Sequence, residues 1–279
     1  MRRLSFSRLM TRAVPQRFRR TAIHHDYVAG VWIFVSIRFS KRVLLLDESR
    51  DAFLRTLVYL GGYCTVEQAQ KLGLAHSPTR VVAQLEVLKS AGFLRQIANY
   101  PVIHQVTMSA TRLVGADLMA RRWHTPLTIR SKLLGVNFYL EAKAWPAEFT
   151  FPHSEKIALF NAAGCPTDAL PHVGGRPYLW QEFLLRRADG TLCDAALDRP
   201  DNTPKYQTRT LTERYNGVLE VIPREFHLIV VVSSESRARL YRKWAAQPIA
   251  GRFSQDTLKP YQVRTPIPQV NISLEENEL

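Results

Sequence analysis

Between residues 47 and 124, apolar residues recur at helical spacing and are separated by helix start and stop signals. A first helix is predicted over residues 48–60, where Gly61-Gly62 ends an apolar stripe. Thr65, with Gln68 three positions later, forms a capping-box pattern that starts a short second helix ending at Gly73. Ser77-Pro78 combines an N-cap with a first-turn proline and predicts a third helix over residues 78–91.

The third helix has a buried side and an exposed side, and a hairpin is predicted to follow it. Strands over residues 93–97 and 102–107 would flank a short turn, and Ser109 would cap the next helix. Helices followed by such a hairpin indicate a winged helix-turn-helix, whose third helix reads bases with small and hydrogen-bonding side chains. We expect Val81, Val82, Leu85 and Leu88 to be buried, and Thr79, Arg80, Ala83, Gln84 and Lys89 to face outward, with Arg95 on the wing.

The second half of the chain alternates helical and strand patterns, which predicts a mixed sheet covered on both faces. The predicted class is therefore α+β: an N-terminal winged helix-turn-helix followed by a mixed α/β domain resembling a degenerate nuclease-like core. The expected helices span residues 127–145, 154–163, 205–221 and 235–246, and the expected strands 149–151, 178–187, 191–197 and 226–233. The expected division is 1–46 for a basic arm and apolar strand, 47–124 for the winged helix, 125–262 for the α/β domain and 263–279 for a tail.

Asp194 is the only attractive carboxylate for a metal-dependent nuclease in this outline. A two-residue turn at Asp189-Gly190 would place Asp194 opposite Leu185 and turn Glu182 to the other face. No Glu-x-Lys strand follows, and phosphate-loop, GxSxG and HExxH motifs are absent. The sequence thus favours a non-enzymatic protein with no metal or cofactor, and leaves a nuclease that uses Asp194 as the alternative.

Charge changes this picture more than composition does. Lys and Arg number 38 against 24 Asp and Glu, a net charge of +14, which favours polyanionic partners. Residues 1–42 hold ten of the basic residues and one acid, so we expect an arm that binds phosphates, although targeting peptides share this look. The arm residues predicted to contact DNA are Arg2, Arg3, Arg8, Arg12, Arg17, Arg19 and Arg20.

The remaining composition indicates a cytoplasmic protein. Cys64, Cys165 and Cys193 are far apart and odd in number, which fits reduced thiols rather than a disulfide framework or a zinc site. The longest apolar run, residues 27–37, is too short to span a bilayer and is predicted to be a buried strand, with membrane contact as the alternative.

Several motifs resemble the replication-relaxation family, whose members are encoded on plasmids and integrative elements near mobilisation genes. TMSATRLVG is similar to the family's entry into the helix after the wing, and CDAAL around Asp194, ERYNG around Tyr215 and LIVVVSSESRARLYRKW are similar to its second half. The resemblance covers roughly residues 48–246. The acidic pair that usually follows the first Asp is missing from DNTPKYQT, so the resemblance implies DNA binding in replication or transfer rather than a reaction.

The sequence therefore predicts a DNA-binding protein of a mobile genetic element, acting in plasmid replication, conjugation or their regulation. Its winged helix would read duplex DNA while the arm holds phosphates. A homodimer would suit a palindromic site, and a relaxase is a possible partner. A subunit of a larger nucleoprotein assembly is the further alternative.

Overall fold

The computed structural model describes residues 23–28, 31–36, 46–116, 120, 124–179, 183–246 and 258–270. Residues 1–46 and 47–279 form separate compact units. In the first unit, β1 (Ile23–Val28) and β2 (Val31–Ser36) pair antiparallel. The apolar run at residues 27–37 is thus divided between two strands instead of forming one. The protein is a mixture of helices and strands, which confirms the predicted α+β class.

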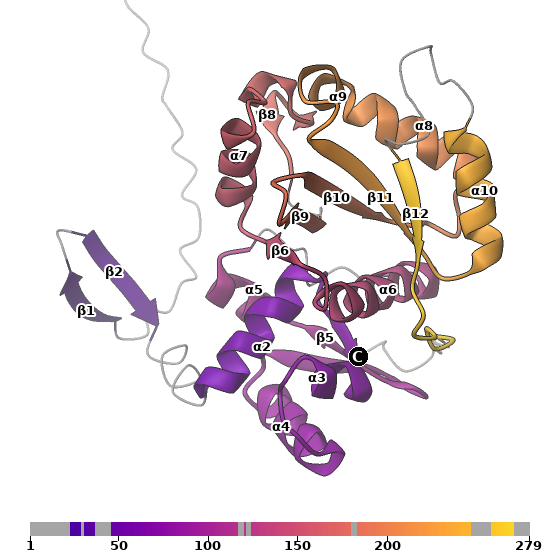
Figure 1. The fold of residues 1–279 in the computed structure, drawn as a ribbon. Coiled ribbons are helices and arrows are strands. Elements are labelled where there is room, and N and C mark those ends of the chain that lie inside the picture. Colours follow the sequence, from indigo (N-terminus) through magenta and orange to yellow (C-terminus); the bar gives the residue numbers. More distant parts are fainter. Residues whose placement is uncertain are drawn as a thin grey trace, which may run out of the picture. The chain divides into compact units, whose positions relative to one another are not determined.

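Residues 47–116 form four helices and a small antiparallel sheet (Figure 1). The sheet order is β3-β5-β4, and β3 was not expected from the sequence. Asp47, Thr65 and Ser77 cap the first three helices, and the capping box of Thr65 and Gln68 is formed as predicted. The fourth helix starts earlier than expected because Thr107, not Ser109, is its N-cap. The elements are α2 (Glu48–Tyr59), β3 (Tyr63–Thr65), α3 (Val66–Lys71), α4 (Pro78–Ser90), β4 (Leu94–Asn99), β5 (Val102–Val106) and α5 (Met108–Val114).

The long helix α6 (Pro126–Ala142) contributes to two hydrophobic clusters. Ile129 and Leu133 pack in one cluster with Tyr63 and Ile103, which belong to the β3-β5-β4 sheet. Farther along the helix, Leu134, Val136, Phe138 and Ala142 pack in the other cluster with strand residues of the second half. A helix with apolar residues on several sides is buried between its neighbours, which explains why so much of α6 is inaccessible.

A five-stranded mixed sheet organises the second half, in the order β12-β11-β10-β9-β6. Neighbouring strands from β6 to β10 are antiparallel, whereas β10, β11 and β12 are parallel. The cluster that holds residues of α7, α8, α9 and α10 and the cluster that holds α6 lie on opposite faces of this sheet. The strands are β6 (Ala147–Thr150), β9 (Phe183–Arg187), β10 (Leu192–Leu197), β11 (Phe226–Val232) and β12 (Leu258–Gln262), with a small hairpin of β7 (His172–Val173) and β8 (Arg176–Pro177). The helices are α7 (His153–Ala162), α8 (Pro204–Arg214), α9 (Asn216–Val221) and α10 (Glu235–Ala245), with a 3-10 turn at Thr167–Ala169.

The turn between β9 and β10 differs from the prediction by one residue. Asp194 pairs with Leu184, not Leu185, because the loop takes three residues. Gly190 has a φ of +87°, as the last residue of a type I turn with a left-handed bulge requires, and the Asp189 carboxylate accepts from the Thr191 N–H. This register undoes the sequence argument that put Glu182 on the opposite face, although Glu182 itself lies outside the described residues.

The single helix predicted over residues 205–221 is two helices, α8 and α9, separated at Tyr215. Gly217 lets α9 lie close to the 3-10 turn, since the carbonyl oxygen of Ala169 lies where a side chain would begin, 2.6 Å from an added Cβ. A larger residue at position 217 would therefore push α9 away from the 3-10 turn that it contacts.

Residues 263–270 follow β12 and pack against the rest of the unit. Val263 and Val270 are buried, the latter beside Tyr63 and Leu133. The Glu141 carboxylate accepts hydrogen bonds from the backbone N–H groups of Arg264 and Thr265. This stretch is consequently held on α6 by both apolar and charge-assisted contacts.

Candidate nucleic-acid interface

Helix α4 is anchored on one side and exposed on the other. Its start is fixed by the Ser77 side chain, which accepts from the Arg80 N–H, and by Pro78 in the first turn. Val81, Leu85 and Leu88 are buried as predicted. Val82 was expected in the same core but is 48% exposed, because position 82 lies about 100° around the helix from Val81. The exposed face therefore carries an additional apolar group.

The predicted base-reading residues differ in how free they are. Thr79 and Arg80 are exposed, and among the described residues their side chains make no hydrogen bond or ion pair. Gln84 is half-buried, and its side-chain oxygen accepts from Arg50 Nε of α2. Among the described residues the amide nitrogen of Gln84 makes no hydrogen bond, so this residue keeps a donor for another partner.

Two predicted DNA-binding cations are engaged within the protein. Lys89 lies 2.7 Å from Glu86 on the same helix, which offsets its charge on this face. Arg95 donates to the Gln105 side chain and to the Ala120 carbonyl oxygen, so its guanidinium braces the sheet. The sequence could not show these pairings for Arg95, whose backbone acceptor at Ala120 is 25 residues away.

The turn between β4 and β5 presents an aromatic side chain. Tyr100 is 88% exposed and precedes a cis bond to Pro101. The neighbouring Gln96 and Asn99 side chains hydrogen-bond each other across the end of β4. A Tyr ring at such a tip has both an apolar face and a polar group available for contact. The arginines predicted for the arm, from Arg2 to Arg20, lie outside the described residues.

Asp194 does not occupy an accessible site. It is 1% exposed on β10, and its cross-strand partners Leu184 and Leu228 belong to the apolar cluster under α8 and α9. No group of three or more His, Cys, Asp or Glu that might hold a metal occurs among the described residues. The described cross-strand neighbours of Asp194 are therefore apolar, and its carboxylate is closed off from solvent.

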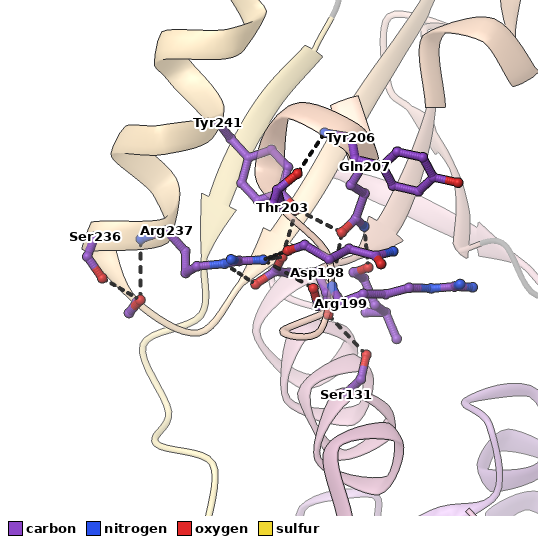
Figure 2. A network of polar contacts seen from close by, with 12 residues as sticks. Ser131, Asp198, Arg199, Thr203, Tyr206, Gln207, Ser236, Arg237 and Tyr241 are labelled. Carbon is purple, nitrogen blue, oxygen red and sulfur yellow. Dashed lines mark hydrogen bonds and ion pairs between the residues drawn. The ribbon is translucent and has the colours of Figure 1, made fainter. Parts of the chain in front are cut away.

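A buried polar network at the end of β10 was not anticipated from the sequence. Asp198 is 2% exposed and directly follows β10 (Figure 2). Arg237 of α10 binds it in a bidentate manner at 2.9 and 2.5 Å, and the Tyr241 hydroxyl lies 2.7 Å from the same carboxylate. The signal was present as Arg and Tyr one helical turn apart on α10, but nothing local identified their partner.

The network joins α8, α10 and α6 at the carboxyl end of the parallel strands. Gln207 of α8 accepts from the Arg199 N–H, donates to the Leu197 carbonyl oxygen and approaches the Tyr241 hydroxyl. Ser131 of α6 donates to the Asp198 backbone carbonyl oxygen. Figure 2 shows these side chains converging on Asp198. The buried carboxylate thus fixes how α8 and α10 lie against the sheet.

Two donors of this network, Arg237 and Tyr241, have raised pKa values. The hydrogen bonds from Arg237 to Asp198 raise the pKa of the guanidinium, which keeps it charged. Burial, and then the Asp198 carboxylate, raises the pKa of Tyr241 far above its usual range, so that the phenol keeps its proton and donates. Both side chains therefore stay protonated and donate to the Asp198 carboxylate, which ties α10 to the end of β10.

Comparison with known proteins adds no family. No protein-family model matches the chain, and neither a curated protein nor a solved structure is significantly similar to it. Within the residues that the structure describes, no helix is both long and apolar enough to cross a membrane.

Proposed function

We propose that residues 47–124 are a winged helix-turn-helix that binds duplex DNA, with α4 as the recognition helix and the β4-β5 turn as the wing. The observation that carries the proposal is the outward face of α4, which is exposed from its capped start and bears Thr79, Arg80, Val82 and Ala83. These small, hydrogen-bonding and apolar groups suit the floor of a major groove, where an apolar side chain can meet the thymine methyl group.

The protein's charge supports the same partner. A net charge of +14 attracts phosphates over distance, and cations of residues 1–42 supply much of it. We assign these residues the sequence-independent part of binding and α4 the choice of site. The second half, in this proposal, is a degenerate nuclease-like core without catalysis, because Asp194 is enclosed among apolar residues.

The proposed setting is a mobile genetic element in the cytoplasm of its host. There the protein would bind a site for replication or transfer, as the resemblance to replication-relaxation proteins implies, as a dimer or with a relaxase. The protein would then act by occupying DNA rather than by cutting it.

The test is selection from a library of random 20-base-pair duplexes, followed by sequencing of the bound fraction. The full chain is expected to enrich a motif, and Arg80→Ala to broaden it while keeping salt-dependent binding, because a side chain that reads a base contributes about 1–3 kcal/mol of discrimination. Arg176→Ala is the matched control, since Arg176 is exposed on β8. An identical motif from wild type and Arg80→Ala would refute the role of α4.

A further inference from the structure

Helices α8 and α10 lie side by side over one face of the five-stranded sheet (Figure 1). Their outward sides together make a surface that is rich in cations and aromatic rings. We call the following residues the α8–α10 surface: Lys205 and Tyr206 from α8, and Arg239, Lys243 and Trp244 from α10. All are exposed except Trp244, which is half-buried.

The cations of these helices differ in their partners, and Arg214 at the end of α8 donates to the Tyr178 carbonyl oxygen. Arg237 is taken by Asp198, Arg242 by Glu235 and Arg209 by Glu213. By contrast, the cations of the α8–α10 surface form no ion pair among the described residues: Lys205, Arg239 and Lys243. The acids of α8 and α10 form their ion pairs with other arginines, although Glu235 also feels the charge of Arg239, and Lys205 and Lys243 are left without an ion pair among the described residues.

Trp244 orders two of these cations. The ammonium of Lys205 lies 5.0 Å from its ring centroid and that of Lys243 lies 5.7 Å from it. A lysine held over an indole has already lost part of the rotamer freedom that binding would otherwise remove. The two positive charges come from different helices and share one ring, so they are arranged before any ligand arrives.

We propose that the α8–α10 surface is a second nucleic-acid contact, which binds the phosphodiester backbone independently of α4. Ordered cations that have no acidic partner suit a row of phosphates, and Tyr206, at 60% exposure, offers a ring on which a base can stack. The inference stands on residues of α8 and α10 and does not require the proposed function of the winged helix.

An anionic membrane is the less suitable partner for the same charges. Helices that lie in a membrane interface insert an apolar face. The apolar side of α10 is occupied, since Ala238 and Tyr241 are buried against the protein, and Leu240 is the large apolar residue that the helix exposes. Phosphates on a nucleic acid require only the charged side that is free.

The test uses the full chain with Lys205→Glu and Lys243→Glu together, measured by fluorescence anisotropy on a 20-nucleotide single strand and on a 20-base-pair duplex. Loss of two phosphate contacts is expected to weaken binding roughly tenfold or more at 0.1 M salt. It should also reduce the slope of log K against log salt by about 1.4 on the single strand or about 1.8 on the duplex. The arm that shows the larger loss identifies the form of nucleic acid.

The matched control is Lys143→Glu with Arg176→Glu, an equal charge change at exposed positions on other elements. An equal loss in this control, or no loss in the α8–α10 variant, would overturn the inference. So would a variant that loses binding to phosphatidylserine vesicles while keeping its nucleic-acid affinity. Thermal melting shows whether the double variant folds. If it does not, the single substitution Lys205→Glu is tested instead, and it should lose half as much of the slope of log K against log salt.

Substitution of Trp244 tests whether ordering of the two lysines, and not their charge alone, contributes to affinity. Trp244→Leu keeps every cation in the sequence but removes the ring that orders Lys205 and Lys243, so nucleic-acid affinity should fall about threefold with an unchanged salt slope. Trp244→Phe keeps an aromatic ring and should keep most of the affinity. Failure of the proposed function has a different signature, because Arg80→Ala alters sequence preference and the α8–α10 variants alter affinity for every sequence.

Discussion

The exposed face of α4 and the α8–α10 surface use their cations in opposite ways. On α4, Lys89 is paired with Glu86, and Arg80 is the cation left for a partner among the described residues of that helix. On α8 and α10, a buried carboxylate and two surface acids form ion pairs with three arginines, and other exposed cations form no ion pair among the described residues. In our proposals, base reading by α4 and phosphate binding by the α8–α10 surface are therefore assigned to different parts of the chain.

The largest expected effect separates the buried ion pair from the exposed one. Arg237→Ala should lower the free energy of unfolding by about 3 kcal/mol, because it leaves the Asp198 carboxylate buried without its partner. Lys89→Ala should cost less than about 1 kcal/mol, since its pair with Glu86 is exposed to solvent. Urea denaturation of both variants measures the difference, and equal losses would show that the network does not fix α10.

An intermediate effect is expected from a substitution that frees a cation on α4, so that its exposed face, like the α8–α10 surface, carries a cation without an ion pair. Glu86→Gln releases Lys89 and removes a charge that repels phosphates, so duplex affinity should rise roughly threefold to tenfold, with a salt slope steeper by about one. Anisotropy titrations at several salt concentrations measure both quantities. Glu148→Gln on β6, which releases Arg186 in the same way, is the control for a general gain of charge, and an equal rise there would remove any special role for α4.

The smallest expected effect is a pH dependence of stability that arises at His104, in the same small sheet that α4 packs against. His104 of β5 is 2% exposed, and burial lowers its pKa below the ordinary 6.5. The unfolded chain therefore binds the proton more tightly, and stability should fall as the pH drops from about 7 through 6.5 towards the lowered pKa. His104→Gln should flatten this slope in denaturation curves at about pH 7 and pH 5.

Features that depend on contacts between residues close in the sequence could be predicted, whereas features that depend on contacts between distant elements could not. Helices α2, α3 and α4 were predicted within a residue or two, because Asp47, Thr65 and Ser77 cap them through contacts only three residues long. The exposure of Val82 and the tie of Gln84 to Arg50 depend on where other elements pack. The same holds for the Asp198 network, whose partner Arg237 is 39 residues away.

Turns between strands were predicted in part: their position was correct, but the strand register was not. The Asp189-Gly190 signal identified the hairpin, but one extra loop residue reversed the predicted faces, because side chains alternate along a strand. Strands β3 and β12 escaped notice since their short sequences gain order from neighbours rather than from their own pattern.

Helix α6 gives the chain a constraint on how it can change. Its first turns pack in the cluster of the small sheet and its later turns in the cluster of the large one, so one helix completes two cores. Exchanging residues 47–116 for another module, by recombination or by design, would leave half of α6 without a matching surface. A change in either half must therefore keep the part of α6 that the other half packs against.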